Sequence, residues 1–178
     1  DTTRISVGGS SAGGNMALSL SARLGSERIK SCFALYPAAH LTHPERLDTV
    51  MGCVSDKFRS GVVIPHWCMK LFINAYTTPG TDMNDPRLSP MFYDASKFPK
   101  YVAVACGDAD TLYRMSFDLM KKISGSASGT NVDGSRKFIC VLNEAHEFNT
   151  FGRTRASQEE RDRVEGEAIN MIRASWRQ

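Results

Sequence analysis

The 178-residue sequence contains no long hydrophobic run. A helix that crosses a membrane needs roughly 20 consecutive apolar residues, and no stretch approaches that length. The first residues, Asp1-Thr2-Thr3-Arg4, also lack the charged and then apolar segments of a signal peptide. The sequence therefore predicts a protein without a membrane span.

An excess of charge of one sign is also missing. The formal net charge is +3, and lysine and arginine are scattered along the chain. A nucleic-acid-binding domain usually carries a basic stripe or patch. We therefore expect no nucleic-acid partner and a small-molecule substrate instead.

A regular cysteine pattern is also missing. The five cysteines are an odd number without any C-x-x-C spacing: Cys32, Cys53, Cys68, Cys106 and Cys140. This pattern favours neither a complete disulfide framework nor a zinc site. We expect mostly buried free thiols, no metal, and a reducing compartment such as the cytoplasm.

What is present is the composition of a globular domain, with strands and helices in alternation. Apolar runs predict strands at 4–8, 31–36, 101–106 and 137–142. Stripes at helical spacing predict helices through Met16, Ala17, Leu20 and Leu24, through 112–123 and through about 156–177. Strands alternating with helices indicate an α/β fold, with a mostly parallel sheet covered by helices on both faces.

One segment interrupts this alternation. Residues 41–84 form an insertion that is too long for a simple crossover. Within it, one apolar helical face is expected to include Ile64, Trp67, Cys68, Leu71, Phe72 and Tyr76. This face either packs on the core or forms a lid. We divide the chain into core residues 1–40, a lid insertion at 41–84, and core residues 85–178.

The first strand leads into Gly9-Ser10-Ser11-Ala12-Gly13, a Gly-x-Ser-x-Gly motif. At a strand-to-helix turn this motif exposes a serine hydroxyl in a strained backbone, with small residues on either side. A serine hydroxyl is a poor nucleophile until a base activates it and donors stabilise the oxyanion. The motif predicts Ser11 as the nucleophile of a serine hydrolase.

A base and an acid follow in the order that this kind of site requires. His146 follows the strand at 137–142 and is the histidine in the second half of the chain. Asp108 and Asp110 both follow the strand at 101–106, and their positions alone do not separate them. Carboxyl ends of parallel strands share one edge of a sheet, so these side chains should meet Ser11 there.

Four segments resemble the hormone-sensitive lipase family of carboxylesterases, whose fold is the α/β-hydrolase fold. They are Gly9-Ser10-Ser11-Ala12-Gly13-Gly14-Asn15, Asp85-Pro86-Arg87-Leu88-Ser89-Pro90, Asp110-Thr111-Leu112 and His146-Glu147-Phe148. The resemblance implies a catalytic triad of Ser11, Asp110 and His146, so it selects Asp110 over Asp108. The reaction that this resemblance implies requires no cofactor and no metal.

Three departures accompany this resemblance. Ser10 stands where the family has Asp, and Glu147 stands where it has Gly, beside the predicted base. The family's His-Gly-Gly oxyanion loop and first strands do not appear in this sequence. Only the backbone N–H of Ala12 is therefore assigned to the oxyanion hole. We expect this chain to be the C-terminal portion of a longer protein, accompanied by its N-terminal portion.

The resemblance implies hydrolysis of carboxylic esters with short to medium acyl chains through an acyl-enzyme. Trp67, Leu71 and Phe72 are expected to line the acyl pocket. Two alternatives remain open. One is a ligand-binding protein without catalysis, like the plant gibberellin receptors, which resemble the family but lack the histidine. The other is an acyl transferase or peptidase that uses the same triad.

Overall fold

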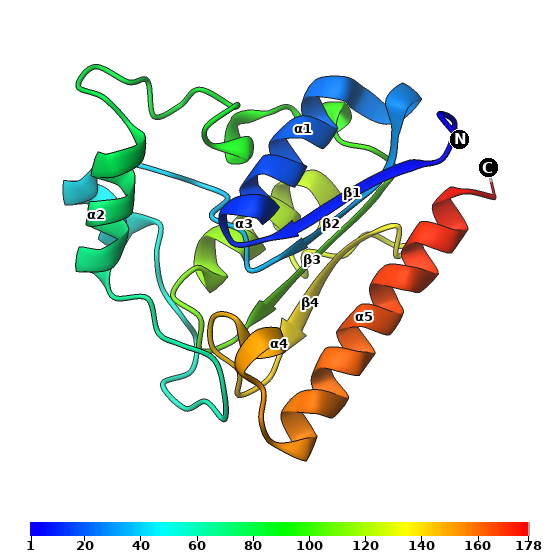
Figure 1. The fold of residues 1–178 in the computed structure, drawn as a ribbon. Coiled ribbons are helices and arrows are strands. Elements are labelled where there is room, and N and C mark those ends of the chain that lie inside the picture. The colour runs from blue at the N-terminus through cyan, green and yellow to red at the C-terminus, as the bar shows by residue number, and fades with distance from the viewer. Residues whose placement is uncertain (178) are drawn as a thin grey trace.

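A computed structural model describes residues 1–177 and contains a parallel four-stranded sheet in the order β1-β2-β3-β4 (Figure 1). The strands are β1 (Ile5–Ser10), β2 (Ile29–Leu35), β3 (Tyr101–Gly107) and β4 (Arg136–Val141). All three pairings are parallel. The predicted fold class is confirmed, since a parallel sheet covered by helices is the α/β arrangement.

Helices cover both faces of this sheet. On one face lie α1 (Ala12–Arg28) and α3 (Tyr113–Ser124), and on the other lies α5 (Arg155–Ser175). The shorter α4 (Phe148–Phe151) precedes α5, and α2 (His66–Tyr76) belongs to the insertion. Short 3₁₀ turns lie at Pro44–Thr49, Pro90–Phe92 and Ala95–Lys97.

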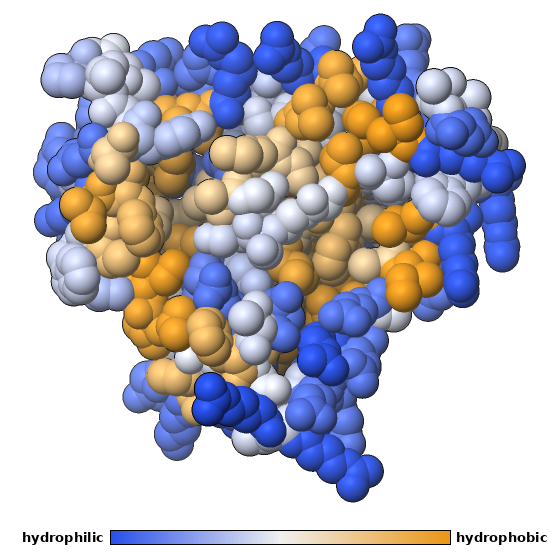
Figure 2. Space-filling model, viewed as in Figure 1, coloured by the Kyte–Doolittle hydropathy of each residue, from blue (hydrophilic) through white to orange (hydrophobic). Residues whose placement is uncertain are grey.

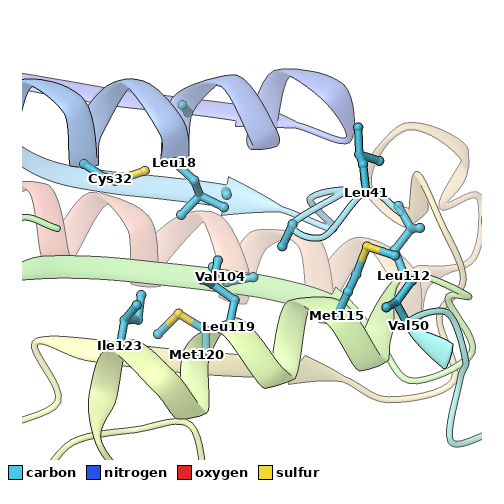
Figure 3. Close-up of a cluster of buried hydrophobic side chains, with 14 of the residues drawn as sticks. Leu18, Cys32, Leu41, Val50, Val104, Leu112, Met115, Leu119, Met120 and Ile123 are labelled. Carbon is cyan, nitrogen blue, oxygen red and sulfur yellow. The ribbon is translucent and has the colours of Figure 1, made fainter. Parts of the chain in front are cut away.

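Two apolar cores sit on either side of β3. After Tyr101, every residue of β3 is buried, which explains its continuous apolar sequence. Leu18 of α1, Val104 of β3 and Leu119 of α3 belong to the larger core (Figure 3). Phe148 and Met171 belong to the smaller core beneath α5. Burial on both faces places β3 at the centre of the fold.

The apolar stripe expected for α1 differs from the buried face of that helix. Ala17, Leu18 and Ala22 are buried, whereas Met16, Leu20 and Leu24 are exposed. Apart from Leu18, the apolar residues that face the sheet are small, because α1 packs on β1 and β2. The larger side chains therefore form a second, outward apolar stripe, and Figure 2 shows hydrophobic residues over this helix.

The insertion lies beyond the carboxyl ends of the strands, with α2 set apart from the sheet (Figure 1). On α2 only Met69 and Ile73 are buried, and the other large apolar side chains stay exposed. Figure 2 shows hydrophobic surface in the region of α2. No helix in residues 1–177 is long and apolar enough to cross a membrane.

Candidate active site

The turn between β1 and α1 has the geometry of a nucleophile elbow. Ser11 has φ 53° and ψ −119°, outside the helical region, and its N–H donates to the Leu35 carbonyl at 2.9 Å. A Cβ on Gly9 would lie 2.5 Å from the backbone of Gly13, so only glycine fits at position 9. A Cβ on Gly13 would meet nothing within 4 Å. The close approach therefore explains the first glycine of the motif and not the second.

The side chains of Ser11, His146 and Asp110 form one continuous hydrogen-bonded chain. His146 Nε2 lies 3.0 Å from Ser11 Oγ, and His146 Nδ1 lies 2.8 Å from Asp110 Oδ2. Asp110 is fully buried, and its Oδ1 accepts from the Leu112 N–H at 2.8 Å. The carboxylate is thus fixed in place, with one oxygen left to orient the imidazole.

Asp108, the other candidate acid, contacts a different group. Its Oδ1 accepts a hydrogen bond from the backbone N–H of Asn143 at 2.7 Å. Asn143 lies in the loop that carries His146 and has a left-handed φ of 57°. Asp108 therefore anchors this loop, while Asp110 reaches the imidazole.

Tyr36, which the sequence did not mark as a site residue, packs against the histidine. Its ring centroid lies 4.4 Å from that of His146, and its hydroxyl is hydrogen-bonded to Asn149 Oδ1. Burial raises the pKa of Tyr36 to about 12, with the negative charges of Glu147 and Asp110 acting in the same direction. The phenol therefore stays neutral and supports the imidazole from one side. Tyr36 directly follows β2, at the edge of the sheet that bears Ser11. This position is the sequence signal that could have marked Tyr36 as a site residue.

An apolar cavity of about 720 Å³ opens above Ser11 and His146. Its walls come from α1, the insertion and α2, and Leu41, Val63, Met69, Phe72 and Tyr76 are among the lining residues. Glu147 lines the cavity beside His146. It has a left-handed φ of 59°, the conformation for which glycine is favoured. Among the described residues, the cavity wall is almost entirely uncharged, with Glu147 as its one carboxylate.

Only one of the three predicted pocket residues lines the cavity in the structure. Phe72 lines the cavity, but Trp67 and Leu71 do not, and they are 68% and 58% exposed. The expectation for Trp67 and Leu71 is corrected by the orientation of α2. Successive residues of a helix lie about 100° apart, and the helix turns Cys68, Met69 and Phe72 toward the cavity.

Ala12 occupies the position expected of an oxyanion donor. It begins α1, and the N–H groups of a first helical turn have no acceptor inside the helix. Ala12 lines the cavity next to Ser11. Among residues 1–177 no group of three or more His, Cys, Asp or Glu is arranged to hold a metal ion.

Solved structures with this fold include several esterases. EstE1, a thermophilic carboxylesterase from a metagenomic library, has a TM-score of 0.73 and 23% identity, over 99% of this chain and 56% of its own. An esterase from the archaeon Pyrobaculum calidifontis has a TM-score of 0.70 and 20% identity, over 99% and 53%. Brefeldin A esterase, a bacterial homologue of human hormone-sensitive lipase, has a TM-score of 0.67 and 22% identity, over 97% and 49%.

This chain thus spans about half the length of these structural neighbours. Among proteins of curated function, none matches the sequence significantly. A family model described as "alpha/beta hydrolase fold" matches residues 1–149, which is most of the chain. Together with the nucleophile elbow and the order of the strands, this match shows that the chain belongs to the α/β-hydrolase family.

Proposed function

We propose that this chain carries the catalytic triad of a serine carboxylesterase. The observation that carries the proposal is the hydrogen-bonded chain from Ser11 through His146 to Asp110, at the base of an apolar cavity. A strained, partly exposed serine beside an oriented imidazole is the arrangement that activates a hydroxyl for attack on a carbonyl. The esterases with the same fold support this choice of reaction.

The mechanism follows from the three side chains. His146 Nε2 takes the proton of Ser11 Oγ as that oxygen attacks the ester carbonyl, and Asp110 holds the other ring nitrogen. The Ala12 N–H then donates to the oxyanion of the tetrahedral intermediate. The alcohol leaves with the proton from His146, and an acyl-enzyme remains. Water, activated by the same imidazole, releases the acid and restores Ser11.

The cavity favours uncharged acyl groups of short to medium length. Its apolar walls supply burial energy of about 0.8 kcal/mol for each methylene that leaves water. A volume of about 720 Å³ accommodates a small ester without requiring the long tunnel of a triglyceride site. An acyl transferase or a peptidase would use the same triad. Measured turnover of different substrate classes therefore has to distinguish these reactions.

The test is a panel of p-nitrophenyl esters from acetate to palmitate, with matched anilides and thioesters. We expect the largest kcat/KM for acyl chains of about two to eight carbons, and much slower cleavage of the anilides. A fluorophosphonate probe should label Ser11, located by peptide mass spectrometry. Absence of ester turnover in a protein that still folds would contradict the proposal and favour a binding role.

We also propose that a further polypeptide segment, the N-terminal portion of the same protein, pairs with β1. This strand bonds to β2 on one side and forms the edge of the sheet on the other. A shallow surface runs along it through Val7 and Gly8 to Phe33 and Ile172. Exposed edges invite pairing, and the outward stripe of Met16, Leu20 and Leu24 on α1 supplies a further apolar contact.

Hydrogen exchange of the protein as isolated tests this pairing. The backbone amides of β1 should exchange slowly if a strand covers them, and intact mass analysis should find the additional sequence. A single 178-residue species, active and with rapidly exchanging β1 amides, would contradict the proposal.

A further inference from the structure

The Glu144 side chain is completely buried, yet it takes no part in the triad. It lies two residues before His146, in the loop that follows β4. A buried carboxylate is costly unless it is fully hydrogen-bonded, so its surroundings demand an explanation. No sequence pattern marked this residue.

Three side chains satisfy the carboxylate. Glu144 Oε1 accepts from Arg59 Nε at 3.1 Å and from Ser157 Oγ at 2.8 Å, while Oε2 accepts from Ser60 Oγ. We call Arg59, Ser60, Glu144 and Ser157 the Glu144 cluster. The Arg59 side chain also donates to the Leu142 carbonyl at 2.8 Å, so this side chain contacts the same loop twice. Charge-assisted bonds of this kind are about twice as strong as neutral ones.

The cluster joins three separate parts of the fold. Arg59 and Ser60 belong to the insertion, Glu144 to the loop after β4, and Ser157 to the first turn of α5. Short backbone bridges accompany it, pairing Ser60 with Glu144 and Val62 with His146. The insertion therefore lies against the histidine loop as a strap, residues 59–62.

The strap binds the backbone of the catalytic histidine itself. The His146 N–H donates to the Val62 carbonyl at 3.0 Å, and the Val62 N–H donates to the His146 carbonyl at 2.7 Å. Gly61 has a φ of 94°, and a Cβ there would lie 2.4 Å from the His146 carbonyl oxygen. This approach leaves no room for a side chain at position 61.

Glu144 is also connected to the acid of the triad. Its backbone carbonyl accepts from the Ala109 N–H at 3.1 Å, immediately before Asp110. A shift of Glu144 would therefore disturb the loops that carry His146 and Asp110 together. Misplacement of a catalytic group by about 1 Å costs up to about 100-fold in rate.

We propose that Glu144 is a positioning residue for the triad. Through its cluster it locks the histidine loop to the strap and to α5, so that both nitrogens of His146 stay within reach of Ser11 and Asp110. This inference rests on the proposed esterase function. The insertion would then help to position the triad through Arg59 and Ser60, in addition to lining the cavity.

Two substitutions at one position provide the test. In Glu144→Ala, three donors lose their acceptor, and we expect kcat to fall about 10- to 100-fold with KM within about twofold of wild type. In Glu144→Gln, the amide oxygen still accepts from Arg59 and Ser157, and the amide nitrogen donates to Ser60 Oγ. We therefore expect kcat within about threefold of wild type. Rates are divided by the number of serines titrated with a fluorophosphonate, so that unfolded molecules do not count.

The matched control is Glu167→Ala. Glu167 of α5 forms an ion pair with Lys137 of β4, a link between helix and sheet that lies outside the site. The Glu167→Ala substitution should leave the rate per titrated serine unchanged. In wild type, the low-field resonance of the His146 Nδ1 proton reports its contact with Asp110, and Glu144→Ala should broaden or shift it.

The possible results separate clearly. An unchanged kcat in folded Glu144→Ala, equal losses in the alanine and glutamine variants, or a change confined to KM would overturn the positioning role. If Glu144→Ala does not fold, Arg59→Met serves instead: a fall in kcat of about fivefold or more supports the role, and a smaller fall overturns it. Absence of turnover in wild type would contradict the proposed function itself, while the proton resonance would still test the positioning.

Discussion

The histidine loop and helix α2 both border the cavity, but they are held in opposite ways. The loop from Asn143 to His146 is fixed by backbone bridges, by Asp108 and by the buried Glu144. Helix α2 buries only Met69 and Ile73 and leaves Trp67, Leu71 and Tyr76 exposed. The side chains of the proposed triad are thus positioned by directional hydrogen bonds, whereas the α2 wall of the cavity depends on a few apolar contacts. We expect changes near the loop to alter the rate of reaction, and changes on α2 to alter stability and substrate binding.

The largest effect should follow from Ser11→Ala. The nucleophile is lost while the surrounding hydrogen bonds of the loop remain, so kcat should fall by roughly 10⁴ to 10⁶. Ester hydrolysis and thermal unfolding of the same preparation check this. Retention of more than about a tenth of the wild-type rate would exclude Ser11 as nucleophile.

Asp110→Asn and Asp108→Asn separate orientation of the imidazole from anchoring of the loop. An amide in place of the Asp110 carboxylate would favour the wrong histidine tautomer, and kcat should fall on the order of 10⁴. Asp108→Asn keeps an oxygen that can accept from the Asn143 N–H, so we expect a loss below about tenfold. Steady-state kinetics of the two variants decides the assignment, and equal losses would reverse it.

Ile73→Ala and Leu71→Ala compare two faces of α2. Ile73 is 2% exposed and Leu71 is 58% exposed. Loss of the buried side chain should lower the free energy of unfolding by about 2 to 4 kcal/mol. Loss of the exposed one should cost about 0.5 kcal/mol or less. Urea denaturation of both variants measures the difference, and a large cost at Leu71 would show that another surface covers that face.

Glu147→Gly should have the smallest effect. Glycine adopts the left-handed conformation of this position without the strain that a side chain brings, which should add about 0.5 to 1 kcal/mol to stability. Removing the one carboxylate of the described cavity wall should also raise the turnover of anionic esters relative to cationic ones. Thermal denaturation and paired kcat/KM values test the two effects separately.

The sequence by itself determined the elements with strong local signals. Short apolar runs indicated the strands and apolar stripes at helical spacing indicated the helices, because the buried surface of each element must be apolar. The Gly-x-Ser-x-Gly motif at a strand end indicated Ser11, and the resemblance to a known family separated Asp110 from Asp108. Each of these signals depends on neighbouring residues or on a recognised motif.

Only the tertiary structure decided which long-range contacts complete the site. It placed Tyr36 against the imidazole and turned α2 so that Phe72 lines the cavity while Trp67 and Leu71 do not. It also joined Arg59 to Glu144, which lie 85 positions apart in the chain. Such contacts depend on how separate elements pack, and a hydrophobic stripe does not specify which of two adjacent faces meets its neighbour. Local sequence therefore indicated the residues of the proposed triad. The packing of separate elements decided which residues hold that triad in place and which residues line the cavity.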